Sequence, residues 1–556
     1  MFKKNTKHQQ PALISAASEL PEKQLKLLER SWASSFYHEF FCRIDEEIFA
    51  KLYSSEPSRP NVPVNVMIGL EVMKAGFGWS DAELYENYCF NLQVRYGLGY
   101  DRLGDGDFAI RTLYYFREKL SKHYLETGNN LLEQTFEQIT DAQILDMQVQ
   151  TGMQRMDSTQ IASNIVNANR LQLLVEAIQR THRILSEGDQ NRLAESFAPY
   201  MKETAGHYTY RVKGKEAVQA HLRQVGEVIY QLLEELKDGY ASEKAYQVLK
   251  RIFTENFNLI EREVCPKENQ ELSSGSLQSV DDLEASYRTK ANAHYKGYVA
   301  NITETCDPEN DLQLITKVQV APNNTDDSVL LAEALPNLQE RTDLDTLMTD
   351  GGYGGEASDE ALDGQPVKLI QTAIRGSKPD PTKLHLSDFD IQFDQQGTPT
   401  HISCPNEQNV PITPARTTGL QARFDPEVCS ACPFHQEGRC RAKPQKRDRR
   451  YLIAFTRKEI QVAQRRKEFL EHQDCGQNLR AAVEATVRSV KHPFRAGKLP
   501  VRGQFRITCM IIASTIHVNV RRIHRVLADQ FSFLLFPSSE YAFFLLKIPS
   551  GFEFLQ

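Results

Sequence analysis

Residues 148–160 of the chain read QVQTGMQRMDSTQ, and this stretch decides the predicted fold. Its alternating pattern predicts a β-strand that ends in a polar triplet, with Asp157 where the strand ends. Residues 346–350, TLMTD, predict a second strand that ends at Asp350 and runs into two glycines. In open α/β sheets, sites form at the edge where strands end, and a carboxylate there points out of the core. Asp157 and Asp350 are therefore predicted site residues.

Three more strands complete the predicted sheet. Alternating patterns predict strands at residues 297–305 and 312–320, and residues 365–373 predict another. A helix is expected at residues 328–335, which Pro336 would end. This order of strands and helices is an α/β layer architecture. With two inserts removed, one helical and one containing cysteines, it matches a ribonuclease H-like core, a mixed five-stranded sheet flanked by helices.

The N-terminal residues are expected to form a helical domain. Residues 63–74 have apolar side chains at helical spacing, and residues 107–120 predict a second amphipathic helix. Ser80 and Glu83 have the spacing of a capping box. The second of these helices carries the cations Arg111, Arg117 and Lys119. Both a DNA-binding role and a plain packing role fit this pattern.

The changes of pattern along the chain predict its domains. The expected parts are residues 1–140 for the helical, DNA-binding domain, 141–166 and 290–375 for the sheet core, 167–289 for the helical insert, 376–457 for the cysteine-containing insert, 458–530 for the C-terminal helical part of the core, and 531–556 for an apolar tail.

Composition limits the kind of protein. The chain has 556 residues and a net charge of −7 at neutral pH, and no stretch reaches the roughly 18 apolar residues of a membrane span. Basic residues nevertheless crowd residues 439–450 and 480–525, so local charge permits DNA binding. We expect a cytoplasmic protein with no membrane partner.

A third carboxylate is expected on a helix near the C-terminus. Arg480, Glu484 and Lys491 are spaced by four and seven residues, which places them on one helix face. The neighbouring stripe that can be buried consists of Val483, Val487 and Val490. One carboxylate flanked by cations suits a site that holds both metal and DNA phosphate.

Three carboxylates are enough for phosphodiester chemistry. Two Mg²⁺ ions roughly 3.5–4 Å apart activate the attacking oxygen and stabilise the leaving oxygen. Mg²⁺ prefers oxygen ligands and keeps several waters, so about three carboxylates can hold the pair. Asp157, Asp350 and Glu484 are therefore predicted to be catalytic and to bind two Mg²⁺ ions, for which Mn²⁺ can substitute.

The C-terminal motif resembles a known family. The spacing of Arg480, Glu484 and Lys491 resembles the C-terminal signature of bacterial insertion-sequence DDE transposases, although Gln477 stands where that signature has a tyrosine. The segments MDSTQI around Asp157 and TDGGYGG around Asp350 resemble the first and second aspartate motifs of the family.

Other segments agree with this resemblance, which covers about residues 40–530. Lys290 followed by Gly297 and Tyr298 resembles the block between the family's aspartates, and the cysteine segment resembles that of the insertion-sequence 1182 family. The resemblance implies a ribonuclease H-like catalytic core and magnesium dependence. It also implies double-stranded DNA partners, namely terminal inverted repeats and target DNA, and a homodimer assembled on DNA.

Four cysteines near the C-terminal third form a candidate metal site. Cys429 and Cys432 have the spacing of a chelating pair, and Cys440 with either Cys404 or His435 can complete a tetrahedral zinc site. Reduced thiols without metal are the main alternative, and a disulfide is the other.

Cations around the third carboxylate are expected to contact DNA phosphates. They are Arg480, Arg488, Lys491 and Arg495. Such contacts give affinity without sequence choice. The predicted function is transposase activity, that is, metal-dependent cleavage and strand transfer. The alternatives are a non-catalytic, element-derived DNA-binding protein and a metal-dependent nuclease that cuts without joining.

Overall fold

A computed structural model describes most of the chain. The described residues are 1–10, 15–57, 59–102, 104–201, 211–290, 293–373, 380–394, 397–415, 419–445, 449–471, 477–494 and 497–535. Within this part of the chain, no helix has both the length and the apolar character needed to cross a membrane. Most of the predicted apolar tail, residues 536–556, lies outside the described residues.

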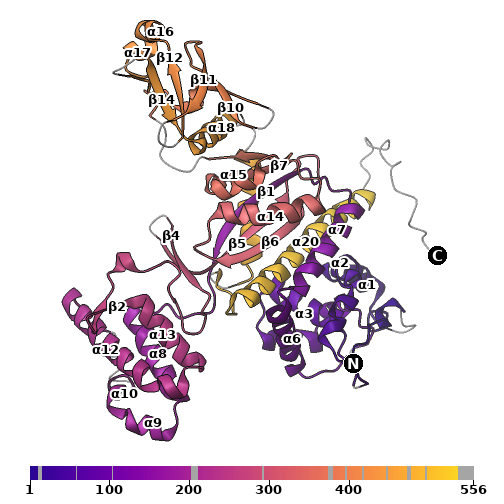
Figure 1. The fold of residues 1–556 in the computed structure, drawn as a ribbon. Helices are drawn as coiled ribbons and strands as arrows, with labels where there is room; N and C mark the ends of the chain where they lie inside the picture. Colours follow the sequence, from indigo (N-terminus) through magenta and orange to yellow (C-terminus); the bar gives the residue numbers. More distant parts are fainter. Residues whose placement is uncertain are drawn as a thin grey trace.

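A mixed sheet stands at the centre of the fold (Figure 1). Its strands lie in the order β6-β5-β1-β7-β8, and β4 pairs with the free part of β5. Their bounds are β1 (Met153–Ile161), β4 (Ser286–Lys290), β5 (Ala293–Thr305), β6 (Ile315–Pro322), β7 (Thr346–Thr349) and β8 (Lys368–Gln371). Strand β5 is antiparallel to β1 and β6, whereas β7 is parallel to β1 and β8 is parallel to β7. The five predicted strands are present, and β4 is a sixth that was not predicted.

Two predicted boundaries are wrong. Strand β1 continues to Ile161, so Asp157 lies within the strand, because β1 pairs with β5 from Gln154 to Ile161. Helix α14 (Asp327–Arg341) continues through Pro336. A proline inside a helix removes one backbone hydrogen bond, but buried leucines before and after Pro336 hold both halves of α14 in one apolar cluster with Met156 of β1 and Leu347 of β7.

The N-terminal part of the chain is helical, as predicted, and we call its helices α1 to α7 the head. Their bounds are α1 (Glu22–Glu29), α2 (Trp32–Glu39), α3 (Val64–Phe77), α4 (Asp81–Phe90), α5 (Leu92–Gly97), α6 (Arg111–Thr127) and α7 (Leu131–Asp146), with short 3₁₀ helices at Lys7–Gln9, Phe41–Arg43 and Glu46–Leu52. The predicted capping box of Ser80 and Glu83 is confirmed at the start of α4. Arg117 of α6 forms ion pairs with Glu71 and Asp81 inside the head.

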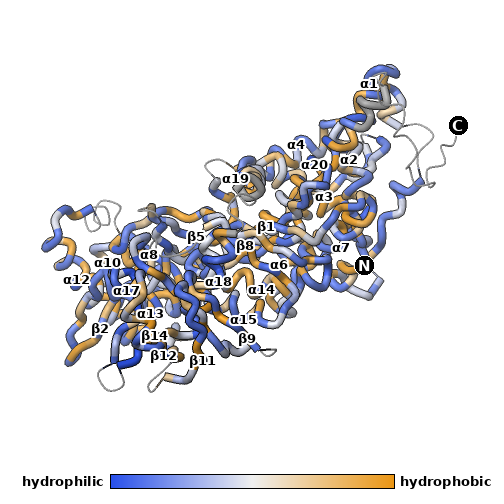
Figure 2. Tube along the Cα trace, turned by 90° about the horizontal axis from the view of Figure 1, so that it is seen from above, coloured by the Kyte–Doolittle hydropathy of each residue, from blue (hydrophilic) through white to orange (hydrophobic). Residues whose placement is uncertain are grey.

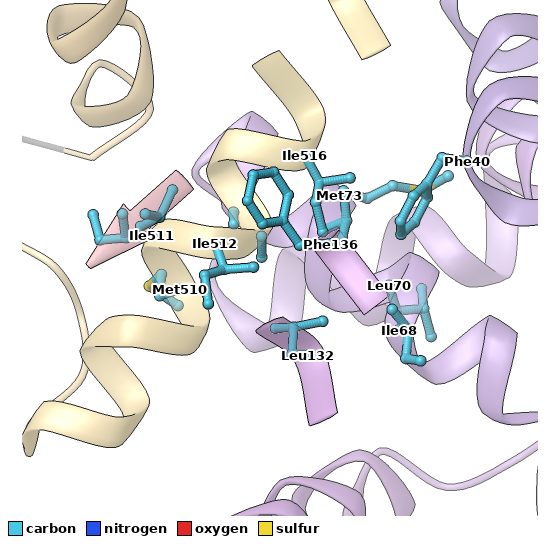
Figure 3. Close-up of a cluster of buried hydrophobic side chains, with 14 of the residues drawn as sticks. Phe40, Ile68, Leu70, Met73, Leu132, Phe136, Met510, Ile511, Ile512 and Ile516 are labelled. Atoms are coloured by element: carbon cyan, nitrogen blue, oxygen red, sulfur yellow. The ribbon is translucent and has the colours of Figure 1, made fainter. Parts of the chain in front are cut away.

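The head and the sheet share one hydrophobic core. Helix α20 (Gln504–Leu535) runs between them and packs on α3 and on β6 (Figure 1). Figure 3 shows Ile512 and Ile516 of α20 beside Met73 of α3 and Phe136 of α7. The same cluster includes Ile302 of β5. Burial of this many side chains couples the head to the central sheet.

The insert between β1 and β4 is a separate helical body with its own core. It contains α8 (Arg170–Ile184), α9 (Glu187–Arg192), α10 (Ala194–Met201), α12 (Lys215–Tyr240), α13 (Lys244–Asn256), the hairpin β2 (Phe257–Ile260) and β3 (Glu263–Pro266), and a 3₁₀ turn at Asn269–Glu271. The expected helical insert is not helical throughout, because Phe257 and Val264, beyond Asn256, are buried on paired strands. Viewed from above, the insert and the head lie at opposite ends of the molecule (Figure 2).

The cysteine-containing insert is an antiparallel sheet in the order β13-β14-β12-β11-β10-β9. Its elements are a 3₁₀ turn (Leu386–Asp388), β9 (Asp390–Phe393), β10 (Pro399–Ser403), β11 (Asn409–Pro414), β12 (Leu420–Phe424), α16 (Pro426–Ala431), α17 (Pro433–Gln436), β13 (Lys443–Pro444) and β14 (Tyr451–Phe455). Helix α18 (Arg457–Glu471) follows and returns to the central sheet through the ion pair of Arg465 with Asp359 of α15 (Glu356–Leu362). Helix α19 (Gln477–Lys491) then precedes α20.

Gly76 of α3 permits the contact between α3 and α20. A Cβ atom at this position would stand 2.0 Å from Cγ of His517. Burial lowers the pKa of His517 to about 3, so the ring packs there in its neutral form. Its centroid lies 4.9 Å from that of Phe77.

The variant Gly76→Ala should lower the free energy of unfolding by about 3 kcal/mol, because overfilling a packed core forces side chains and backbone apart. The measurement is denaturant unfolding of the full chain. Gly239→Ala is the matched control, since no atom lies within 4 Å of a Cβ there, and alanine should favour helix α12 by up to about 1 kcal/mol. Equal unfolding midpoints for Gly76→Ala and the wild type would contradict this packing.

Candidate active site

The three predicted carboxylates lie around one open cleft. Asp157 of β1, Asp350 after β7 and Glu484 of α19 all line it, and its volume is about 730 Å³. Lys290 of β4 and Arg488 of α19 line the same cleft. Residues far apart in the sequence are thus brought to one place, in an arrangement of acidic groups bordered by cations.

The pairing of β1 with β7 places the two aspartates at the open end of the sheet. The parallel pairing stops at Arg155 and Met348, so the second half of β1 has a strand only on its β5 side. Asp157 lies two residues beyond that last pair, and Asp350 directly follows β7. Both aspartates therefore lie near the end of β7, where β1 no longer has a neighbouring strand on that side, although Asp157 is inside a strand.

Short local hydrogen bonds fix both aspartate backbones. The Ser158 N–H donates to Asp157 Oδ1 at 2.9 Å. Asp350 caps the 3₁₀ turn Gly351–Tyr353, and its Oδ1 accepts from the Gly352 N–H at 2.8 Å. A Cβ at Gly352 would stand 2.9 Å from that Oδ1, so the turn needs a glycine there.

Helix α19 presents Glu484 to the cleft. Its predicted apolar stripe is confirmed, because Val483, Val487 and Val490 are buried. Glu484 and Arg488 are exposed on the other side. The Lys491 ammonium donates to Thr159 Oγ1 at 3.1 Å and to the Gln160 carbonyl at 2.9 Å, which ties the end of α19 to β1.

A buried network of ion pairs and hydrogen bonds also holds helix α19 in place. Glu304 of β5 is fully buried and lies 2.7 Å from Arg155 Nε and 2.8 Å from Arg522 of α20. The Thr486 hydroxyl of α19 donates to Glu304 at 2.8 Å and accepts from Arg522. One carboxylate therefore joins β1, β5, α19 and α20, the elements that position the cleft.

A fourth carboxylate, Asp327 at the start of α14, was missed by sequence reasoning. Burial raises its pKa, while a hydrogen bond from Ser158 and the charge of Arg288 lower it. The phenol of Tyr353 is also completely buried, and burial together with the charges of Asp327, Asp157 and Asp350 raises its pKa. Its hydroxyl donates to Asn301 Oδ1 at 2.6 Å. No local pattern distinguishes Asp327 from a helix cap, so only the fold reveals its neighbours.

The donor set suits a hard divalent cation, since carboxylate oxygens are the preferred ligands of Mg²⁺. Among the described side chains, no three His, Cys, Asp or Glu groups stand close enough together to hold an ion as they are placed. The cleft therefore brings carboxylates to one place without holding three of them at metal-binding distance. Of the residues predicted to contact DNA, Arg488 and Lys491 line the cleft, whereas Arg495 and the side chain of Arg480 lie outside the described part of the chain.

The predicted zinc ligands also come together. Cys404, Cys429, Cys432, Cys440 and His435 line one small cavity of about 20 Å³ between α16, α17 and the antiparallel sheet. Burial raises the pKa of the Cys429 thiol to about 11 and also raises that of Cys440. The thiols share a cavity. As they are placed, however, no three of these side chains in the described part of the chain lie close enough together to hold a metal ion.

Comparison with known proteins supports a DDE transposase. Residues 403–524, which include Glu484 and run from β10 into α20, match a family model described as "Transposase DDE domain". Searches of curated proteins and of solved structures gave no match. The match covers the C-terminal part of the fold, and the cleft adds the two aspartates that lie outside it.

The variant Glu304→Ala should lower the free energy of unfolding by about 3–5 kcal/mol, because it leaves the buried Arg155 and Arg522 without a counter-charge. Thermal unfolding of the full chain measures this loss. Glu309→Ala is the control, because Glu309 is exposed at the end of the same strand pair, and it should change stability by less than about 0.5 kcal/mol. Equal losses in the two variants would show that the network does not hold these elements together.

Proposed function

We propose that this protein is a transposase that cleaves DNA at the terminal inverted repeats of a mobile element and joins the ends to target DNA. The observation that carries the proposal is the meeting of Asp157, Asp350 and Glu484 at one cleft. The match of residues 403–524 to a transposase DDE domain supports it independently. The cysteine insert is the basis for proposing the insertion-sequence 1182 type within this class.

The strand arrangement supports a ribonuclease H-like core. In the order β6-β5-β1-β7-β8, the first three strands in sequence are antiparallel neighbours and the last two run parallel to the first. In this core, Asp157 lies on the first strand, Asp350 follows the fourth strand of the core in sequence, and Glu484 lies on a C-terminal helix. We assign the head to DNA-end recognition, and the helical and cysteine-containing bodies to inserts in this core.

In the proposed mechanism, Asp157, Asp350 and Glu484 hold two Mg²⁺ ions, which would supply activation of the attacking oxygen and stabilisation of the leaving oxygen. Lys290 and Arg488 face the same cleft and can bind the phosphates on either side of the cut. Lys491 holds α19 against β1 and so fixes the distance of Glu484 from the aspartates. First water and then a DNA 3′-hydroxyl attacks the phosphodiester, and the leaving oxygen departs on the opposite side.

The partners follow from the chemistry. We propose that two copies of the chain assemble on two DNA ends, so that both ends reach target DNA together. Such a protein would act at the bacterial nucleoid, in the cytoplasm.

The variants Asp157→Asn, Asp350→Asn and Glu484→Gln should each lower strand transfer by about 100-fold or more, since each removes a charged metal ligand at constant size. The assay follows Mg²⁺-dependent cleavage and joining of duplexes that carry the element's inverted repeats. A gel shift on the same DNA should stay near the wild-type value. Glu360→Gln, on the exposed side of α15, is the control and should retain activity.

Other outcomes point to other functions. Joining retained by any of the three variants contradicts the assignment of that residue. Cleavage by the wild type without joined products indicates a nuclease, and DNA binding without either reaction indicates a non-catalytic DNA-binding protein.

We further propose that Cys404, Cys429, Cys432 and Cys440 bind one structural Zn²⁺ ion. Four thiols at one buried cavity form a soft donor set that suits zinc. The raised pKa values of Cys429 and Cys440 favour protonated thiols at these two residues in the metal-free protein, so binding would release protons and draw the sulfurs together.

Metal analysis of the purified chain should give about one zinc per molecule, and the double variant Cys429→Ser, Cys432→Ser should remove it and destabilise the β-sheet insert. Cys265→Ser, on β3 of the other insert, is the matched control and should keep the zinc. A wild-type protein without zinc, or a double variant that retains it, contradicts the site.

A further inference from the structure

Asp327 lies close to Ser158 and Asp350, which line the cleft, and one of its carboxylate oxygens accepts no hydrogen bond among the described residues. The residue is 5% exposed, and within the described part of the chain its Oδ1 has no hydrogen-bond partner. A buried carboxylate oxygen without a donor is costly and calls for a specific reason. Helix capping is not that reason, because the neighbouring Asp326 caps α14 by accepting from the Ser328 N–H at 3.1 Å.

A structural ion pair also fails to explain Asp327. Arg288 is a neighbouring cation, but its Nη2 is 3.8 Å from Asp327 Oδ2, beyond hydrogen-bond distance. The other terminal nitrogen of Arg288 donates to the carbonyls of Asn323 and Thr325, each at 3.2 Å. The guanidinium is thus shared with the backbone, and although its charge acts on Asp327, it makes no hydrogen bond to Asp327 Oδ1.

The position of Asp327 places it next to the predicted ligands. A Cβ at Gly352 would stand 2.8 Å from Asp327 Oδ2 and 2.9 Å from Asp350 Oδ1, so the two carboxylates border the same point. Ser158, which follows Asp157 in β1, hydrogen-bonds to Asp327. Two carboxylates this close repel each other unless a cation lies between them or beside them.

We propose that Asp327 is a further carboxylate of the cation site, and that a divalent cation held by Asp350 also takes Asp327 as a ligand through the oxygen that lacks a donor. This inference rests on the proposed function, because it assumes that the cleft binds metal. It explains the unpartnered oxygen, the absence of a capping role, and the glycine at residue 352, whose missing side chain leaves room beside both carboxylates. Without metal, the charge of Asp327 destabilises the fold.

The test measures Mn²⁺ binding to the full chain by calorimetry and metal-free unfolding by thermal denaturation. Asp327→Asn keeps the size and the acceptor for Ser158 but removes the charge. We expect its Mn²⁺ dissociation constant to rise at least about tenfold, and its metal-free unfolding temperature to equal or exceed that of the wild type. Asp326→Asn is the matched control, since asparagine also caps helices, and it should bind Mn²⁺ as the wild type does.

Each result decides the inference. A dissociation constant for Asp327→Asn that rises less than tenfold, while Asp157→Asn loses both Mn²⁺ binding and DNA cleavage, overturns the role of Asp327 and leaves the proposed function intact. A variant that fails to fold, or that unfolds at a lower temperature without metal, assigns Asp327 to the scaffold and also overturns the inference. A wild-type chain that binds no Mn²⁺ overturns the metal cleft and this inference together.

Discussion

Mutual repulsion of carboxylates at one cleft is the constraint on which the rest of this structure depends. Asp157, Asp350 and Glu484 line a common space, and Asp327 is buried next to Asp350. Groups of like charge separate unless rigid elements hold them, because repulsion grows as water is excluded. The fold therefore has to supply the free energy that brings these residues together before any cation arrives.

Several interactions provide that rigidity at a distance from the cleft. Glu304 joins β5 to β1 through Arg155, to α20 through Arg522 and to α19 through the Thr486 hydroxyl. The Lys491 ammonium fixes the other end of α19 to β1. Helix α20 packs on both the sheet and the head, so its apolar core stabilises α19 indirectly (Figure 3). The head and α19, which carries Glu484, are therefore linked through α20.

The parts of this arrangement that are local in sequence were predictable. Alternation identified the five strands of the core, and the valine stripe gave the correct buried face of α19 because a helix repeats every 3.6 residues. Asp157 and Asp350 were selected because polar residues or glycines follow them in the sequence, although β1 continues past Asp157 in the structure. The strand end after Asp157 was misplaced, since the length of β1 depends on its pairing with β5, which lies beyond an insert of more than a hundred residues.

The remaining features depend on contacts that sequence patterns do not encode. Asp327 looks like any acidic residue at a helix start, and its burial follows from the packing of α14 on β1 and β7. Glu304 is a charged residue on a buried strand, which a pattern of hydrophobicity marks only as an exception. Its partners come from three other elements, so no spacing rule could have named them.

The cysteine-containing insert lies apart from the cleft. It enters after β8 and leaves through α18, which the pair of Arg465 and Asp359 anchors to the core (Figure 1). Among the described residues, those that line the cleft come from β1, β4, α19 and the segments that follow β7 and α19, and none comes from this insert. Helix α19 instead packs on β1 and on α20, and the Lys491 ammonium ties its end to β1. The position of Glu484 at the cleft therefore depends on contacts of α19 with the central sheet and with α20.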